Sequence, residues 1–154
     1  MGMRIAFPVA VAICVAVPQA LSAQPAVPSM AEESAAAAAV VQDYYAALAA
    51  RDFRRAYASW ADGGAASGKG LAGFANGFAH TRSTAVRIVS ASPPDGAAGS
   101  MYVTVMVEVE ATLDSGVAQR FTGTYTLRRV NGVPGATAEQ LSWHIASAEL
   151  HPAG

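Results

Sequence analysis

The alternation of side chains between residues 101 and 129 constrains the fold more than any other feature of this sequence. Every odd-numbered residue from 101 to 113 is apolar, whereas the even-numbered residues are mixed and include two glutamates. A period of two is typical of a β-strand with one buried face. The Asp-Ser-Gly sequence at 114–116 then supplies a three-residue turn, since glycine can adopt the left-handed conformation that such turns use. This stretch therefore predicts one long β-hairpin.

The two strands of the predicted hairpin match on both faces in a single register. In that register Glu110 faces Arg120 on the polar face. The opposing pairs on the apolar face are Val109 with Phe121, Val105 with Tyr125 and Val103 with Leu127. A slip of one residue would break both faces, so the hydrophobic pattern specifies the pairing. Gly123 falls opposite Val107, where a glycine allows either a sharp bend or a close neighbour, and we interpret it as the bend of a curled sheet.

Three helices are predicted ahead of the hairpin. Ser29 and Glu32 have the spacing of a capping box, which opens a long helix over about residues 30–50. The apolar residues of this helix recur at helical spacing: Ala37, Val40, Val41, Tyr44, Tyr45 and Leu48. Asp52 can cap a short second helix. Leu71 begins a short third helix after a glycine-rich loop at residues 62–70.

One strand is predicted on each side of the hairpin, at residues 84–91 and 139–150. Leu141, Trp143 and Ile145 share one face of the last strand, and residues 151–154 form a frayed tail. Helices come first and strands follow without alternating, which indicates an α+β fold. We expect one domain over residues 29–150, with a long N-terminal helix and two short helices packed on a curved four-stranded antiparallel sheet in a cone-shaped roll.

The first 23 residues have the pattern of a secretory signal peptide. Arg4 supplies a positive charge, an apolar run follows, and Ala23 ends a small-residue cleavage site. Prolines interrupt the apolar run, which is short for a membrane span. We therefore expect an exported protein, periplasmic or secreted, that begins at Gln24 with a loose lead over residues 24–28. In the alternative, the signal is retained and anchors the protein in the cell envelope. The expectation of no membrane span therefore applies to the protein after signal cleavage.

Cys14 is the only cysteine of the chain and lies within this apolar run. A lipoprotein would be anchored through it, but Ile13 precedes it where a small residue is normally needed. After ordinary cleavage the protein would have no thiol. Disulfides, thiolate catalysis and cysteine metal sites would then be excluded together.

Charge and motif spacing argue against nucleic acid, nucleotide and metal binding. The chain has ten basic and eleven acidic residues and no basic stripe, so it lacks the electrostatic footprint of a nucleic-acid-binding protein. Gly63, Gly68 and Lys69 have the spacing of a phosphate-binding loop, but Gly70 stands where that motif requires Ser or Thr. No cluster of His and carboxylate residues has metal-ligand spacing. We expect no cofactor.

The sequence YYAALAARDFRRAY at residues 44–57 begins in the long N-terminal helix, and short helices and a meander that ends in SWHIASAEL follow. This arrangement resembles the nuclear transport factor 2-like (cystatin-like fold) superfamily, over residues 29–150, and in particular its small exported bacterial members. The resemblance implies a cone in which a bent sheet wraps the long helix and leaves a pocket between them. The superfamily includes ketosteroid isomerases, dehydratases and SnoaL-like polyketide cyclases, as well as non-enzymatic binding and dimerisation modules, so the fold does not settle the function.

A pocket in such a cone would be lined mainly by aromatic side chains. The expected lining is Tyr44, Tyr45, Trp60, Phe74, Phe78, Val105, Phe121, Tyr125 and Trp143. This set contains no inward acid–base pair. It favours a non-catalytic small-ligand-binding or assembly module of the bacterial cell envelope, with a small apolar ligand.

The alternative function is an isomerase- or dehydratase-like enzyme. Superfamily enzymes place an acid or histidine in the cone with a hydrogen-bond donor beside it. Here Tyr44 or Tyr45 would be the donor, and Asp43 or His80 would be the base. The competing interpretation is structural, with both tyrosines filling the core, Asp43 in solvent and His80 in a loop.

The polar face of the hairpin is expected to point away from the pocket. Glu108, Glu110, Arg120 and Arg128 share this face, which makes them poor catalytic candidates. A flat, half-apolar surface lies on the same face: Tyr102, Thr104, Met106, Thr122, Thr124, Thr126 and His144. Members of the superfamily often dimerise through this surface, so a homodimer is a further expectation.

Overall fold

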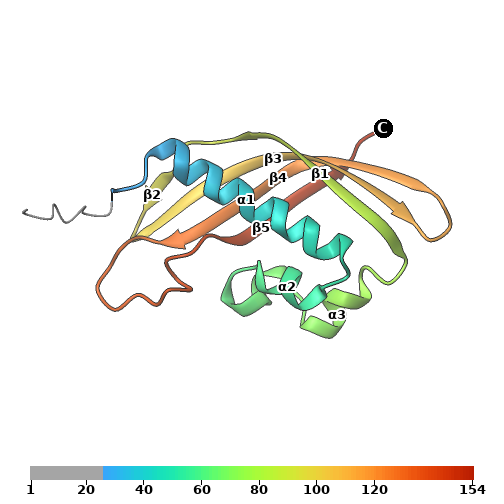
Figure 1. Cartoon of the computed structure of the whole chain (residues 1–154), viewed down its shortest axis with the longest axis horizontal. Helices are drawn as coiled ribbons and strands as arrows, with labels where there is room; N and C mark the ends of the chain where they lie inside the picture. Colours follow the sequence, from blue (N-terminus) through green and yellow to red (C-terminus); the bar gives the residue numbers. More distant parts are fainter. Residues whose placement is uncertain (1–25) are drawn as a thin grey trace, which may run out of the picture.

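The computed structural model of the protein describes residues 26–154, so the predicted signal peptide and Cys14 lie outside the described part. Helix α1 spans Met30–Ala49, α2 spans Phe53–Ala58 and α3 spans Leu71–Asn76. A 3-10 helix, η1, occupies Asp62–Ser67. Figure 1 shows these helices on one side of a long curved sheet. Within residues 26–154, the helices are too short or too polar to cross a membrane.

The sheet is antiparallel and follows the order β1-β3-β4-β5, with β2 paired to β3. Strand β1 spans Thr81–Ala91, β2 spans Asp95–Ala97, β3 spans Ser100–Leu113, β4 spans Ala118–Val130 and β5 spans His144–Pro152. The predicted α+β fold is confirmed. The three-residue strand β2 is additional to the four predicted strands.

The hairpin of β3 and β4 has the predicted register. Glu110 pairs with Arg120, and Val105 pairs with Tyr125. The turn closes with Gly116 at a φ of 88°, in the left-handed region. The side chains of Glu110 and Arg120 lie on the solvent side, 3.3 Å apart, and both are more than half exposed.

Gly123 has a different role from the bend that the sequence suggested. A Cβ atom at this position would overlap the carbonyl oxygen of Glu149 on β5. The glycine therefore permits the close approach of the neighbouring strand, which is the second of the two reasons for a glycine inside a sheet.

The predicted ends of the long helix are accurate. The side chain of Ser29 accepts a hydrogen bond from the backbone N–H of Glu32, and the Glu32 carboxylate accepts one from the backbone N–H of Ser29. The pKa of Glu32 is held below its usual value, because the backbone N–H of Ser29, and to a lesser extent the Ser29 side chain, stabilise the carboxylate. Asp52 caps α2 by accepting from the backbone N–H of Arg55 at 3.1 Å.

The last strand differs from the prediction. Strand β5 begins at His144, and Leu141 lies in a turn with 41% of its surface exposed. A bulge follows, since Leu127 pairs with Ile145 whereas Thr126 pairs with Ser147. The strand continues into the predicted tail as far as Pro152. The expected loop at 62–70 is also partly ordered, as η1.

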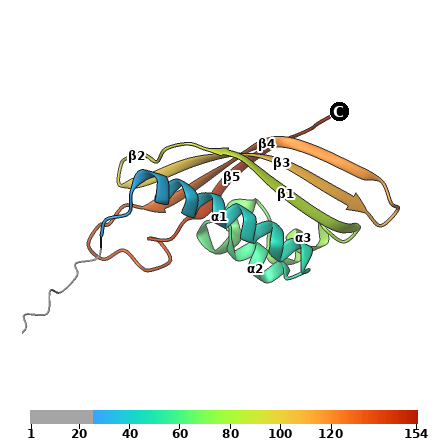
Figure 2. The same ribbon diagram turned by 45° about the horizontal axis from the view of Figure 1, so that its top comes forward.

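The core fills the space between α1 and the concave face of the sheet. Figure 2 shows α1 crossing beneath the sheet, with α2 and α3 beside its C-terminal half. The buried residues of α1 are Ala37, Val41, Tyr44, Tyr45, Ala47 and Leu48, which match the predicted stripe except at Ala47, while Val40 is half-buried. They meet the buried valines of β3 together with Tyr125, Leu127 and Ile145.

Candidate functional site

Three tyrosines occupy the centre of the cone. Tyr44 and Tyr45 come from α1, and Tyr125 comes from β4; none is more than 6% exposed. The hydroxyl groups of Tyr45 and Tyr125 lie 2.7 Å apart in a buried hydrogen bond. The Tyr44 ring lies 5.1 Å from the Tyr45 ring and 6.1 Å from the Tyr125 ring. Together these rings close the deep part of the cone.

Burial raises the pKa of all three phenols, because the phenolate is poorly solvated in an apolar interior. The pKa of Tyr45 is raised to about 12. The pKa of Tyr44 rises further because of the neighbouring Tyr45, and that of Tyr125 rises because of both other tyrosines. At neutral pH these groups are therefore uncharged, and they can donate a hydrogen bond but cannot act as bases.

The open part of the cone is a cleft of about 200 Å³ at its mouth, which we call the aromatic cleft. Its lining consists of Tyr44, Trp60, Ser67, Lys69, Phe74, Gly77 and Phe78. The walls are aromatic rings in edge-to-face or tilted contact, at 6.1 Å for Tyr44 and Trp60 and 5.3 Å for Phe74 and Phe78. A volume of this size suits a small molecule with one ring rather than a drug-sized one.

Two hydrogen-bond donors of the aromatic cleft are only weakly satisfied within the described residues. The indole N–H of Trp60 is buried and makes no hydrogen bond of good geometry there, although its interaction with the Tyr44 hydroxyl opposes the effect of burial on the pKa of that phenol. Lys69 forms no ion pair with the carboxylates of residues 26–154. A buried N–H without a partner costs free energy, and an acceptor atom of a bound molecule would satisfy it.

The η1 turn positions Lys69 beside the rings. Gly64 has a φ of 101°, and a Cβ atom there would collide with the ring of Tyr57. The Tyr57 hydroxyl in turn donates a hydrogen bond to the carbonyl oxygen of Lys69 at 2.8 Å. The Lys69 ammonium nitrogen lies close to Gly77, since a Cβ atom placed on that glycine would be 3.6 Å from it. Gly63 and Gly64 thus allow the η1 turn to fold back over the cone mouth.

The structure brings four of the nine predicted lining residues to this cleft: Tyr44, Trp60, Phe74 and Phe78. Tyr45, Val105 and Tyr125 lie in the closed core. Phe121, near the start of β4, packs against the edge of the core. Trp143 lies beside the start of α1, where its indole N–H donates to the Glu33 carboxylate at 3.0 Å.

The structure places both candidate bases on the surface. Asp43 lies 3.6 Å from Arg55 and its side chain is 70% exposed. His80 lies 3.8 Å from Asp114 and its side chain is 92% exposed. Neither is brought to the buried tyrosine hydroxyls of the cone.

Sequence reasoning missed Lys69 and Ser67 as lining residues. It considered Lys69 only as part of a phosphate-binding motif and set it aside with that motif. No local pattern marks its role, because its position depends on how the η1 turn folds back against α1 and Tyr57.

Comparison with protein-family models and with curated proteins gives no match for this sequence. Among solved structures, the chain is similar to the crystal structure of a ketosteroid isomerase-like protein from Erwinia carotovora atroseptica, with a TM-score of 0.54 and 19% sequence identity. The similarity covers 80% of this chain and 98% of that chain. At this identity the likeness concerns the fold, not the activity. The chain therefore has the nuclear transport factor 2-like fold, with a curved sheet that is not closed.

Proposed function

We propose that the protein is a non-catalytic binding module that holds a small, mainly apolar molecule with one acceptor group in the aromatic cleft. The observation that carries the proposal is the Lys69 ammonium group, which has no ion pair in the described residues, beside the buried Trp60 indole N–H on an aromatic surface. A ligand with a ring and an anionic or acceptor group would complement both features. Few, well-placed polar groups in an apolar cleft are typical of small-molecule sites.

The position of the catalytic candidates supports binding rather than catalysis. An isomerase or dehydratase of this fold needs a base within hydrogen-bonding reach of the reacting molecule. Asp43 and His80 are largely exposed and pair with surface residues instead. The Tyr45 hydroxyl pairs with Tyr125 and is not directed at the cleft.

Calorimetric titration with benzoate tests the proposal, because benzoate has a ring and a carboxylate. We expect saturable binding of benzoate, weaker binding of benzyl alcohol, and no binding of acetate. Lys69→Gln should weaken benzoate binding by about tenfold, as loss of one charge-assisted hydrogen bond does. Arg54→Gln, which removes an exposed cation from α2, is the matched control and should leave binding unchanged. Equal binding by the Lys69 variant and the wild type would contradict the proposed ligand class.

The cellular location in this proposal is the bacterial envelope. Its basis is the signal-like sequence of residues 1–23. N-terminal sequencing of exported protein should give a start at Gln24. A start at Met1, or a lipid on Cys14, would indicate that the protein is anchored in the envelope and is not a free exported protein.

A second proposal, assembly into a homodimer, rests on the outer face of the sheet. Met106 is 46% exposed in the middle of β3, and it pairs with Thr124 on β4 and Ser90 on β1. Val89 beside it is 43% exposed. The remaining residues proposed for this face are Tyr102, Thr104, Thr122, Thr126 and His144. Sedimentation of a Met106→Lys variant should show a monomer where the wild type is a dimer. Val117→Lys, at the distant hairpin turn, is the control.

A further inference from the structure

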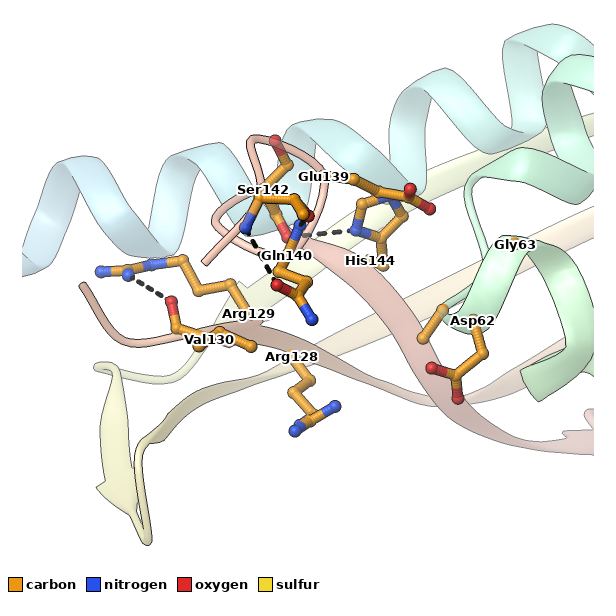
Figure 3. A pocket seen from close by; sticks show the side chains of 11 residues that line it. Asp62, Gly63, Arg128, Arg129, Val130, Glu139, Gln140, Ser142 and His144 are labelled. Carbon is orange, nitrogen blue, oxygen red and sulfur yellow. Dashed lines mark hydrogen bonds between the residues drawn. The ribbon is translucent and has the colours of Figure 1, made fainter. Parts of the chain in front are cut away.

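A second hollow lies between η1 and the connection from β4 to β5, and we call it the polar groove. It has a volume of about 470 Å³, within the range of small-molecule sites. It is framed by η1, the end of β4, and the connection between β4 and β5. Figure 3 shows Arg128 on the strand, Asp62 on the η1 turn, and Gln140 and His144 nearby.

Arg128 is the half-buried cation of this groove. Its Nε donates a hydrogen bond to the Ser100 hydroxyl at 3.1 Å, and Ser100 is only 6% exposed. This contact fixes one edge of the guanidinium group and leaves its terminal nitrogens for other acceptors. Arg128 has no carboxylate of residues 26–154 within ion-pair distance, in contrast to Arg55, Arg87, Arg120 and Arg129.

The groove also carries two carboxylates without an ion pair in the described part of the chain, Asp62 and Glu139. In Figure 3 the Asp62 carboxylate and the Arg128 guanidinium both point away from α1. The other charged lining residue, Arg129, is neutralised by Glu33 at 2.8 Å. The groove therefore presents unpaired charge of both signs.

His144 adds a polar wall next to Arg128, because the two residues are direct partners in the β4–β5 ladder. The Nδ1 atom of His144 lies 3.1 Å from the carbonyl oxygen of Ser142. A carbonyl oxygen can only accept, so Nδ1 carries the hydrogen and Nε2 is left as an acceptor in the neutral ring.

We propose that the polar groove binds a small zwitterion of the amino-acid or dipeptide class. The ligand carboxylate would pair with Arg128, whose planar guanidinium suits two-point recognition of a carboxylate. The ligand ammonium group would be held by Asp62, whose carboxylate points to the same side as Arg128. A simple anion would be repelled by the two carboxylates, and a simple cation would leave Arg128 unsatisfied. This site is separate from the aromatic cleft, so either proposal can fail alone.

The test is calorimetric titration of the full chain with L-alanyl-L-alanine and its two capped forms. We expect the zwitterion to bind about tenfold or more tightly than the N-acetylated or the C-amidated dipeptide, since each cap removes one charge-assisted contact. Arg128→Gln should abolish the preference over the C-amidated form. Asp62→Asn should reduce the preference over the N-acetylated form. Asparagine tolerates the positive φ of 56° at this position as aspartate does, so this variant removes charge without added backbone strain.

Arg87→Gln is the matched control, because it removes an arginine from the same sheet face outside the groove. It should leave all three affinities unchanged. Thermal unfolding identifies any variant that fails to fold. If Arg128→Gln does not fold, Arg128→Lys replaces it, and it should lose most of the preference for the zwitterion over the C-amidated dipeptide. The proposal is overturned if the wild type shows no saturable binding, if the capped dipeptides bind as tightly as the zwitterion, or if Arg87→Gln has the same effect as Arg128→Gln.

Discussion

The hydroxyl groups of Tyr45 and Tyr125 lie 2.7 Å apart in the closed centre of the cone, so each satisfies the other. This pair joins α1 to β4 across 80 residues of sequence. It also explains why the deep cone is not the binding site in our account. Its polar atoms are already paired, and its space is filled by rings.

The pairing predicts a strong asymmetry between single and double substitutions. Tyr45→Phe or Tyr125→Phe alone leaves one buried hydroxyl without a partner and should cost about 1–3 kcal/mol of unfolding free energy. The double variant removes both polar groups and should cost less than the two single changes combined. Chemical denaturation of the four proteins measures this coupling. Additive effects would mean that the two hydroxyl groups do not depend on each other.

The raised pKa values of the buried tyrosines predict sensitivity to alkaline pH. The unfolded phenols ionise near their ordinary pKa of 10, whereas Tyr45 in the folded protein ionises at about 12. Their contribution to stability is therefore fully present below pH 10 and is lost as the pH rises towards 12. Absorbance of the phenolate and circular dichroism should change together for these residues. Ionisation of all five tyrosines of the chain before any loss of structure would contradict the prediction.

The ion pair of Glu33 and Arg129 predicts a second stability effect. Two hydrogen bonds, of 2.8 and 3.1 Å, join the carboxylate to the guanidinium group, and both side chains are less than one-fifth exposed. Glu33→Gln should cost about 3 kcal/mol, because it leaves a mostly buried guanidinium uncompensated. It also weakens the acceptor of the Trp143 indole.

An exposed pair on the same sheet supplies the control for this change. Glu110→Gln breaks the contact with Arg120, where both side chains are about two-thirds exposed. It should cost less than about 1 kcal/mol, because solvent screens the pair. Urea denaturation of both variants decides the matter, and equal costs would show that burial of Glu33 has no energetic consequence.

Gly123 predicts a packing effect of a different kind. Gly123→Ala places a methyl group against the backbone of Glu149 and should cost about 2–3 kcal/mol through overpacking. Gly132→Ala, at a glycine with open space around it, should change the stability little. If the two variants unfold at the same denaturant concentration, then β5 does not approach β4 as closely as described.

The sequence predicted those parts of the fold that depend on periodic patterns. The alternation of the hairpin fixed its register, and the capping residues Ser29 and Asp52 fixed the starts of two helices. The start of β5 was wrong by five residues, because Leu141 continues the apolar alternation but lies in a turn. The bulge near Ala146 leaves no local sequence signal that distinguishes it from a regular strand.

The candidate site was predictable only in part. Of the nine residues expected to line the pocket, Tyr44, Trp60, Phe74 and Phe78 line the aromatic cleft. Which rings fill the core and which remain accessible depends on three-dimensional packing, as the closed position of Tyr125 shows. Lys69 and Arg128 acquire their positions through single contacts with Tyr57 and Ser100, which no spacing rule gives.

The chain's two tryptophans allow a direct test of the aromatic cleft as the binding site. In Trp143→Phe the remaining indole is Trp60 of the cleft, and in Trp60→Phe it is Trp143 beside Glu33. Titration of each variant with 4-nitrobenzoate, an aromatic carboxylate that quenches indole fluorescence, compares the two sites. Our account predicts saturable quenching of Trp60 in the Trp143→Phe protein and only weak, linear quenching in the Trp60→Phe protein. Equal, non-saturating quenching of both variants would contradict the aromatic cleft as a ligand site.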